Sequence, residues 1–274
     1  MAQYSVNRNN YYGTANKDLH EVVMFSDIDG NIINSFGAAS NIPLANGDLV
    51  GYTTVHKFGA VDGTIGTSWS TVWSAAETSG QQLYPWPAIG DASVVTVVST
   101  SGSDTTNVTL EGLDTNYAFQ SETLTLTGTS AVTGNLTWHR INRAFMSGTA
   151  TNVGTIIVKN ATPTVITEIK EERGQSQQAF YTVPAGCTGF LNTVQMTSSK
   201  NQAVEVAMFA RPFGGAFRVV GGVFLYQSDH TIEYATPIKL TEKTDIDVRA
   251  IGGSNGVISA SFDMMIIDNS VLNA

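Results

Sequence analysis

Two aspartates near the N-terminus have the spacing best suited to chemistry in this sequence. Asp27 and Asp29 follow the apolar run Val22–Phe25 and are followed by Gly30. A carboxylate placed after a strand can attack a phosphorus atom, and a second carboxylate nearby can transfer the proton. The pattern therefore makes phosphate-ester chemistry the first hypothesis to weigh.

The pattern resembles the first motif of haloacid-dehalogenase-type phosphatases, but the match is incomplete. Ser26 separates the apolar run from Asp27, and Asn31 stands where a threonine is usual. Phosphatases of this kind also need Mg²⁺, a lysine and a further acidic pair on an open α/β sheet. The later sequence shows no helix–strand alternation that would supply them.

A β-hairpin explains the same residues more simply. The Asp29-Gly30 dipeptide favours a tight turn between residues 25–28 and residues 31–33. A calcium-binding loop is a third interpretation, but the EF-hand spacing fails after Gly30 and no glutamate stands near position 38. We therefore interpret Asp27 and Asp29 as residues of a turn.

The remaining reactive side chains are scattered. Cys187 is the only cysteine, and it follows a predicted turn at 184–186 with no evident base, which is typical of a small space-filling residue. Acidic residues are mostly isolated, so a carboxylate pair of the glycosidase kind could arise only through folding. The sequence thus predicts no catalytic residue, no metal site, no cofactor and no enzymatic activity. The histidines, of which no two have helical metal-ligand spacing, are His20, His56, His139 and His230.

Composition narrows the class of protein and its partners. The 274 residues carry a net charge of −9, and only 14% of them are charged, which together with many Thr and Gly residues suits β structure rather than disorder. An acidic chain without Lys and Arg clusters is a poor partner for nucleic acid or for an anionic membrane. One cysteine allows no internal disulfide, which fits assembly in a reducing cytoplasm. We find no apolar stretch of about 18 residues, which a membrane span requires, and expect no secretory signal.

Short apolar runs separated by turn residues dominate residues 178–268. Strands of this length, with Gly, Pro, Asn and Asp between them, are typical of an antiparallel β sandwich or jelly roll. The long amphipathic helices of a hydrolase or nucleotide-binding fold are missing from this pattern. The predicted strands are Ala179–Val183, Gly189–Met196, Ala203–Ala210, Ala216–Tyr226, Thr231–Ile238, Asp245–Ala250 and Val257–Ile267.

Two of these runs alternate clearly enough to predict their faces. Ile246 and Val248 share one face of their strand, and the charged residues beside them take the other face. In the last run, Phe262, Met264 and Ile266 point one way, toward the core, and the residues between them point away.

The fold class predicted for the chain is all-β, with antiparallel β-sandwich or jelly-roll units and an extended N-terminal arm. Residues 108–113 and 119–127 predict a hairpin in the first unit. The polar stretch 161–164 predicts a link into the second unit, and residues 37–50 are expected to form a loop. The expected divisions are 1–50 for the N-terminal arm and hairpin, 51–160 for the first β domain, and 161–274 for the second β sandwich or jelly-roll domain.

Aromatic residues suggest two partner-binding regions. The first 20 residues are polar without a period, and their tyrosines could order against a partner, although a frayed terminus is the alternative. Residues 52–90 hold the densest aromatic group, and a short helix could place Trp69 and Trp73 on one face. This group could contact a partner, stack sugar rings, or belong to the core or a subunit interface. The candidate partner-binding residues are Tyr4, Arg8, Tyr11, Tyr12, Trp69, Trp73 and Trp86.

Several short blocks occur in an order that carries a family resemblance. Together they resemble structural virion proteins of tailed bacteriophages, particularly those of marine and cyanobacterial phages, over most of the chain from Gly51 onward. Each block is short, so the resemblance depends on their joint order. The blocks are Val55–Gly59, Tyr84–Trp86, Glu111–Asp114, Thr151–Gly154, Tyr181–Gly186, Arg211–Gly214, Lys243–Ala250 and Phe262–Asp268.

The resemblance implies a place in the virus particle and no catalytic residues. We expect a capsid decoration or cement protein that is assembled in the host cytoplasm. A neck or tail accessory protein and a host-glycan-binding virion module are the alternatives. The expected partners are other virion proteins, namely the major capsid protein or neck and tail proteins, and further copies of the chain in a homo-oligomer. Nucleic acid and membrane are not expected as partners.

Overall fold

The computed structural model describes residues 25–26, 32–33, 41–63, 65–78, 80–252 and 256–272. Antiparallel strands make up most of this part, so the predicted all-β fold class is confirmed. None of the helices in the described ranges is long and apolar enough to cross a membrane. The helices are α1 (Asn41–Asn46), α2 (Ala75–Thr78), the 3₁₀ turn η2 (Ile89–Asp91) and α3 (Asn269–Leu272).

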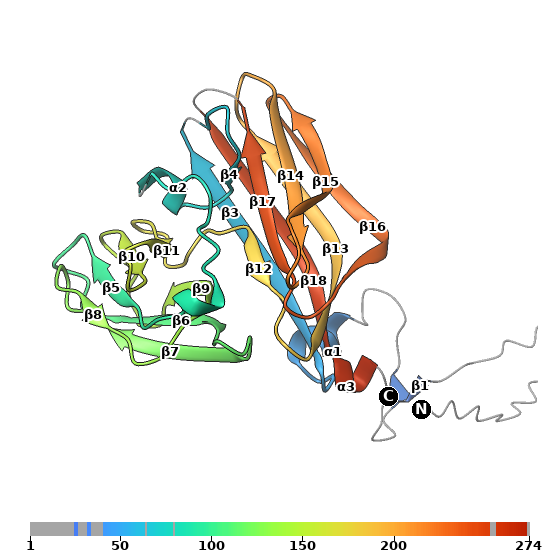
Figure 1. The fold of residues 1–274 in the computed structure, drawn as a ribbon, viewed down its shortest axis with the longest axis horizontal. Helices are drawn as coiled ribbons and strands as arrows, with labels where there is room; N and C mark the ends of the chain where they lie inside the picture. The colour runs from blue at the N-terminus through green and yellow to red at the C-terminus, as the bar shows by residue number, and fades with distance from the viewer. Residues whose placement is uncertain are drawn as a thin grey trace, which may run out of the picture.

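Two antiparallel sheets packed face to face form the larger unit, on the right of Figure 1. The strand order is β16-β13-β18-β3 in one sheet and β12-β17-β14-β15 in the other, and the short β4 (Ser70–Thr71) adds to β17. The other bounds are β3 (Tyr52–Asp62), β12 (Phe180–Thr182), β13 (Cys187–Ser198), β14 (Val204–Arg211), β15 (Arg218–Leu225), β16 (Ser228–Leu240), β17 (Asp245–Ile251) and β18 (Val257–Asp268).

Chain order and sheet order together make this unit a jelly roll. Counted along the chain from β3, the first, third, sixth and eighth strands form one sheet, and the second, fourth, fifth and seventh form the other. This double Greek key is the arrangement of eight-stranded jelly rolls. The jelly roll was one of the two arrangements that the sequence predicted for the C-terminal half.

Alternating apolar side chains fill the space between the two sheets. Ile246 and Val248 of β17 belong to one buried cluster with Phe262, Met264 and Ile266 of β18. The predicted faces of both strands are therefore confirmed. All seven strands predicted for the C-terminal half are present as β12 to β18, with ends that shift by a few residues.

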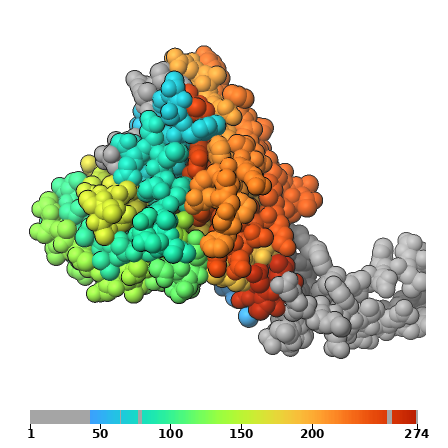
Figure 2. Space-filling model, viewed as in Figure 1, coloured from blue at the N-terminus to red at the C-terminus, as the bar shows by residue number. Residues whose placement is uncertain are grey.

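A smaller β unit, which we call the insert (residues 73–178), interrupts the jelly roll between β3 and β12. Its sheets have the orders β11-β10-β5-β8 and β7-β6-β9, and it has a buried cluster of its own. The predicted hairpin is confirmed by the pairing of β6 with β7. Figure 2 shows the insert, from teal to yellow, beside the orange and red jelly roll. The bounds are β5 (Thr96–Ser99), β6 (Asn107–Leu113), β7 (Phe119–Thr125), β8 (Val132–Thr133), β9 (Arg140–Met146), β10 (Ile156–Lys159) and β11 (Val165–Ile169).

Close backbone contact joins the insert to the jelly roll. A Cβ atom at Gly59 of β3 would lie 2.1 Å from the carbonyl oxygen of Val72 and 2.5 Å from the amide nitrogen of Ala179. These two residues stand near the ends of the insert, and the Ala179 amide donates to the Val72 carbonyl at 3.0 Å. Glycine at position 59 therefore lets both crossing segments lie directly on β3.

The structure corrects three expectations about segments. β3, expected in the 51–160 domain, pairs with β18 along its length, whereas β11, expected in the 161–274 domain, pairs with β10 of the insert. Residues 161–164 therefore connect two paired strands of the insert and do not link two units. The expected loop at 37–50 contains α1. Alternation along a strand indicates its two faces but not its neighbour in the sheet, which explains the two differences in strand pairing.

The N-terminal pair of strands agrees with the hairpin interpretation. β1 (Phe25–Ser26) pairs antiparallel with β2 (Ile32–Ile33), with Phe25 opposite Ile33. The residues between the two strands lie outside the described residues, and they include Asp27 and Asp29.

Candidate functional site at the junction of the two units

Two aspartates of β17 face away from the jelly-roll core and toward the insert. Because Ile246 and Val248 enter the core, Asp245 and Asp247 must point to the opposite face of the strand. Both aspartates are buried nevertheless. The charged face that the sequence predicted is therefore an internal interface between the two units.

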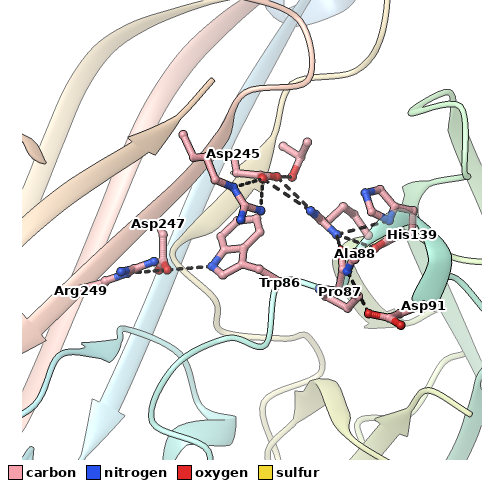
Figure 3. A network of polar contacts seen from close by, with 11 residues as sticks. Trp86, Pro87, Ala88, Asp91, His139, Asp245, Asp247 and Arg249 are labelled. Atoms are coloured by element: carbon pink, nitrogen blue, oxygen red, sulfur yellow. Dashed lines mark hydrogen bonds and ion pairs between the residues drawn. The ribbon is translucent and has the colours of Figure 1, made fainter. Parts of the chain in front are cut away.

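Asp245 accepts hydrogen bonds from two arginines and one hydroxyl, as the close view in Figure 3 shows. Arg140 of β9 donates from Nε to Oδ1 at 3.3 Å, and Thr182 donates from Oγ1 to Oδ1 at 2.6 Å. Arg211 of β14 donates to Oδ2 from Nε at 2.9 Å and from Nη2 at 2.5 Å. Arg140 also donates from Nη1 to the Pro87 carbonyl at 2.5 Å. The side chains of Arg140 and Asp245 are only 3% and 5% exposed, so this ion pair joins the insert to the jelly roll away from water.

Asp247 uses one carboxylate oxygen for three donors. Arg249 Nε, Trp86 Nε1 and Thr71 Oγ1 donate to Oδ2 at 2.7, 3.0 and 3.2 Å. The other oxygen, Oδ1, is buried without a hydrogen-bond partner. Burial raises the pKa of Asp247, and the charge of Arg249 opposes that shift together with the three hydrogen bonds. The donors around Oδ2 therefore favour the ionised form of Asp247, which burial disfavours.

Trp86 connects the two carboxylate clusters. The guanidinium carbons of Arg140 and Arg211 lie 5.2 and 5.5 Å from its ring centroid, within the range of cation–π attraction. Its ring also meets Tyr84 edge-on at 4.8 Å. We call Trp86, Arg140, Arg211, Asp245, Asp247 and Arg249 the junction network. Its charged groups face one another, which suits them to hold the two units together rather than to act on a substrate.

A cleft of about 930 Å³ lies between β3 and the insert. Its volume falls in the range of roughly 300–1,000 Å³ that is usual for small-molecule sites. The lining combines aromatic rings with groups of both charges, among them Phe58, Phe119, Glu111 and Arg143. At its edge, His56 Nδ1 and Asp263 Oδ1 are 2.5 Å apart, and both side chains are more than half exposed.

Lys57 lines the same cleft and is buried. It lies opposite the core residue Phe262 across the β3–β18 pair, and its Nζ donates a hydrogen bond to the carbonyl oxygen of Asn142. Burial, and after it the positive charge of Arg143, lowers the pKa of Lys57 to about 7, and the charge of Glu111 opposes this shift. A lysine with such a pKa is partly a neutral amine near neutral pH and can act as a nucleophile.

Asn142 is the extra residue of a β-bulge in β9. Glu111 of β6 pairs with Arg143, and Gly112 pairs with Ile141, so Asn142 stands between two pairs without a partner on β6. Bulges change the direction of a side chain. The Asn142 side chain is buried, and its Oδ1 has no hydrogen-bond partner. Such an unpaired buried oxygen is uncommon in folded proteins, so Asn142 is an unusual residue in the lining of the cleft.

The three candidate tryptophans have internal positions. Trp73 is 1% exposed and meets Tyr84 edge-on at 5.5 Å. Trp69 is half-buried and meets the ring of Phe209 at 5.1 Å, and Trp86 belongs to the junction network. The short helix that the spacing of Trp69 and Trp73 allowed is absent, and the structure has β4 between them. Trp73 therefore belongs to the core, which was the alternative interpretation, and it could reach a partner only if that core opened.

The remaining sequence-based candidates are the possible metal ligands, Cys187 and the N-terminal residues. In the described ranges, no three His, Cys, Asp or Glu side chains form a group able to hold a metal ion. Cys187 begins β13, and burial raises the pKa of its thiol, which disfavours the nucleophilic thiolate. The candidates that lie outside the described residues are Tyr4, Arg8, Tyr11 and Tyr12.

Two residues that make this junction unusual, Lys57 and Asn142, were not predicted from the sequence. One signal for Lys57 was readable. It stands in the alternating set Val55, Lys57, Gly59 and Val61, whose other members are apolar or small, and a lysine on a core-facing position needs a partner. The bulge at Asn142 has no comparable signal, because it depends on the pairing with β6.

Comparisons with known proteins leave the family open. No family model matches the chain, and no curated protein matches it. Among solved structures, the chain is 12% identical to VP2 in a subviral particle of infectious bursal disease virus, with a TM-score of 0.21, over 80% of this chain and 73% of that one. For the Gx strain of the same virus the identity is 12% and the TM-score 0.22, over 79% and 72%. At these TM-scores the similarity to virus-particle proteins is weak and carries no argument about fold or function.

Proposed function

We propose that this chain is a non-enzymatic structural protein of a tailed-phage virion, a decoration or cement protein that binds and stabilises the capsid shell. The ordered sequence blocks support a place in the particle. The jelly roll is compatible with it, because capsid proteins, lectins and cupins all use this fold. Since a fold does not specify a function, the proposal depends on a separate observation.

The observation that carries the proposal is the exposed edge formed by β15 and β16. These are outer strands of the two sheets, and within the described part of the chain neither pairs with a further strand on its free side. Val219, Phe224 and Tyr226 are exposed there, and Phe224 is 74% exposed. An edge with free backbone groups and large apolar side chains is suited to pair with another chain. Pro237 removes one backbone donor from β16, so β15 is the better docking strand.

Incorporation into virions tests this proposal. We expect Phe224→Ser to reduce the amount of the protein in purified particles, because the substitution removes apolar contact area from the edge. Phe119→Ser is the matched control, since Phe119 is also an exposed phenylalanine but lies on β7 of the insert. Quantitative mass spectrometry of the particles measures both variants. Equal incorporation of wild type and Phe224→Ser would exclude the edge as the docking surface.

Copy number separates the head location from its alternative. A decoration protein follows the symmetry of the shell and should be present in on the order of hundreds of copies, whereas a neck or tail accessory protein should be present in about a dozen. The same mass-spectrometric measurement on wild-type particles gives this number. A count near a dozen would move the protein from the capsid to the neck or tail.

A host-glycan-binding module is the second candidate, and the cleft is the observation that favours it. Phe58 and Phe119 offer apolar faces for sugar rings, and Glu111, Arg143 and Gln175 offer hydrogen-bonding groups beside them. A glycan array probed with the purified protein tests this candidate. Binding that is lost in Phe119→Ser and kept in Phe224→Ser would support it, and an array without binding would remove it.

A further inference from the structure

Three side chains that line the cleft come from three different strands. Lys57 belongs to β3 of the jelly roll, and Glu111 and Asn142 belong to β6 and β9 of the insert. All three line the cleft. They bring together an amine, a carboxamide and a carboxylate, which are the groups needed to join a lysine to an asparagine through an amide bond.

We propose that Lys57 and Asn142 form an intramolecular isopeptide bond, with Glu111 as the group that moves the proton. The bond would tie the insert covalently to the jelly roll. This inference is independent of the proposed place in a virion, because it concerns only groups within one chain.

Geometry supports the lysine–asparagine pair. The Lys57 amine already donates a hydrogen bond to the backbone carbonyl of Asn142, and only a few covalent bonds separate that carbonyl from the residue's own side-chain amide. The bulge removes Asn142 from pairing with β6, and its Oδ1 is buried without a partner. The carboxamide therefore belongs to the residue that the amine already contacts, both side chains line the cleft, and no hydrogen bond competes at the carboxamide oxygen.

The amine is also in a state that permits attack. Burial favours the neutral form of Lys57, and the positive charge of Arg143 acts in the same direction on its pKa. Arg143 Nη1 lies 3.7 Å from Glu111 Oε2, so a guanidinium borders the carboxylate that is to accept the proton. The Glu111 charge acts on Lys57 strongly enough to oppose the shift, so the two groups interact.

The reaction balances without an oxidant or a further reactant. The nitrogen of neutral Lys57 attacks the side-chain carbonyl carbon of Asn142, and a new C–N bond forms. Glu111 accepts the proton that the attacking nitrogen loses and passes it to the amide nitrogen of Asn142. The original C–N bond then breaks, ammonia leaves through the open cleft, and a secondary amide remains between the two side chains.

Mass spectrometry of the full-length protein tests the inference directly. We expect an intact mass lower than that of the Lys57→Met variant, after correction for the substitution, by the mass of one ammonia. Chymotrypsin cleaves after aromatic residues, so it should release the segments 53–58 and 139–145 as one branched peptide. A wild-type protein in which both segments appear only as separate, unmodified peptides would overturn the proposal, whatever the behaviour of the variants.

Variants separate the chemistry from mere proximity. Glu111→Gln removes the carboxylate but keeps a similar shape, so it should retain the full uncrosslinked mass while the circular dichroism spectrum stays that of a folded β protein. Glu122→Gln is the matched control, because Glu122 of β7 lies on the neighbouring strand, outside the cleft lining, and should keep the branched peptide. A branched peptide of undiminished yield in Glu111→Gln would show that Glu111 has no part in the reaction.

Discussion

Substitution of Asp245 by asparagine should destabilise the protein strongly, although the shape of the side chain hardly changes. Breaking a buried ion pair by removal of one partner costs about 3–5 kcal/mol, because the other charge stays buried. Arg140 is 3% exposed and would keep its hydrogen bond to the Pro87 carbonyl. The loss of its ion pair with Asp245 should therefore cost about 3 kcal/mol, the lower end of that range. Arg211 is 27% exposed, so water can replace much of its interaction with Asp245. The loss of this second ion pair should cost under about 1 kcal/mol. We therefore expect a loss of about 3–4 kcal/mol in the free energy of unfolding.

Urea denaturation followed by two signals measures this loss. All four tryptophans stand between positions 69 and 138, so fluorescence reports on the insert and its junction, whereas far-ultraviolet circular dichroism reports on both units. Because Asp245 lies in the jelly roll and Arg140 in the insert, the urea midpoints of both the fluorescence and the circular dichroism signals should shift.

Asp263→Asn is the matched control for this substitution. It breaks the exposed contact with His56, where both side chains are more than half exposed, and should cost less than about 1 kcal/mol. If Asp245→Asn and Asp263→Asn shift the urea midpoint equally, the junction network does not hold the two units together.

Three further outcomes follow from buried groups. Phe262→Asp should cost several kcal/mol in thermal or urea unfolding, because Phe262 is buried in the jelly-roll core and an unpaired charge there is severely unfavourable. Ser261→Asp, one position away on the other face, should be mild, and similar melting of the two variants would contradict the strand register. Burial, and after it the charge of Arg140, lowers the pKa of His139 from 6.5 to about 4. Between pH 6.5 and about pH 4, the imidazole therefore binds a proton in the unfolded chain but not in the folded one. The free energy of unfolding should fall as the pH drops through this range. An equally steep fall in the His139→Phe variant would refute this reasoning. In Asn142→Ala, which leaves the Lys57 amine free, stability should rise between about pH 7 and pH 10.5, because the unfolded amine is protonated over that range and the folded one is not. The double variant Lys57→Met/Asn142→Ala should lack this rise in stability. A rise of equal size in the double variant would exclude Lys57 as the source of the effect.

Local pattern predicted the strands of the jelly roll well, because each strand buries one face and exposes or covers the other. The alternation around Ile246 and Val248 identified the core face, and the apolar set of the last strand did the same. Such alternation arises from the two-residue period of a strand and needs no knowledge of the partners.

What lies opposite a face could not be predicted in this way. Asp245 was placed on the charged face of its strand, but its partner Arg140 is 105 positions away and belongs to another unit. The same limit applies to β3, whose neighbour β18 comes from the other end of the described chain. Contacts between distant segments depend on topology, and a single sequence carries little information about them.

The insertion between β3 and β12 has a consequence for how the chain can fold. Within the part of the chain that the structure describes, β3 has one neighbour in its sheet, β18, and Thr53 pairs with Ile266. During synthesis from the N-terminus, β3 must therefore wait for its partner until β18 emerges. The insert can close first, through its local hairpins β6–β7 and β10–β11. Contacts between distant segments form slowly, and unpaired strand edges invite aggregation in the meantime. A prematurely terminated chain that lacks β18 would expose the edges of both β3 and β13, so its insert could be native while its jelly roll remained open to association.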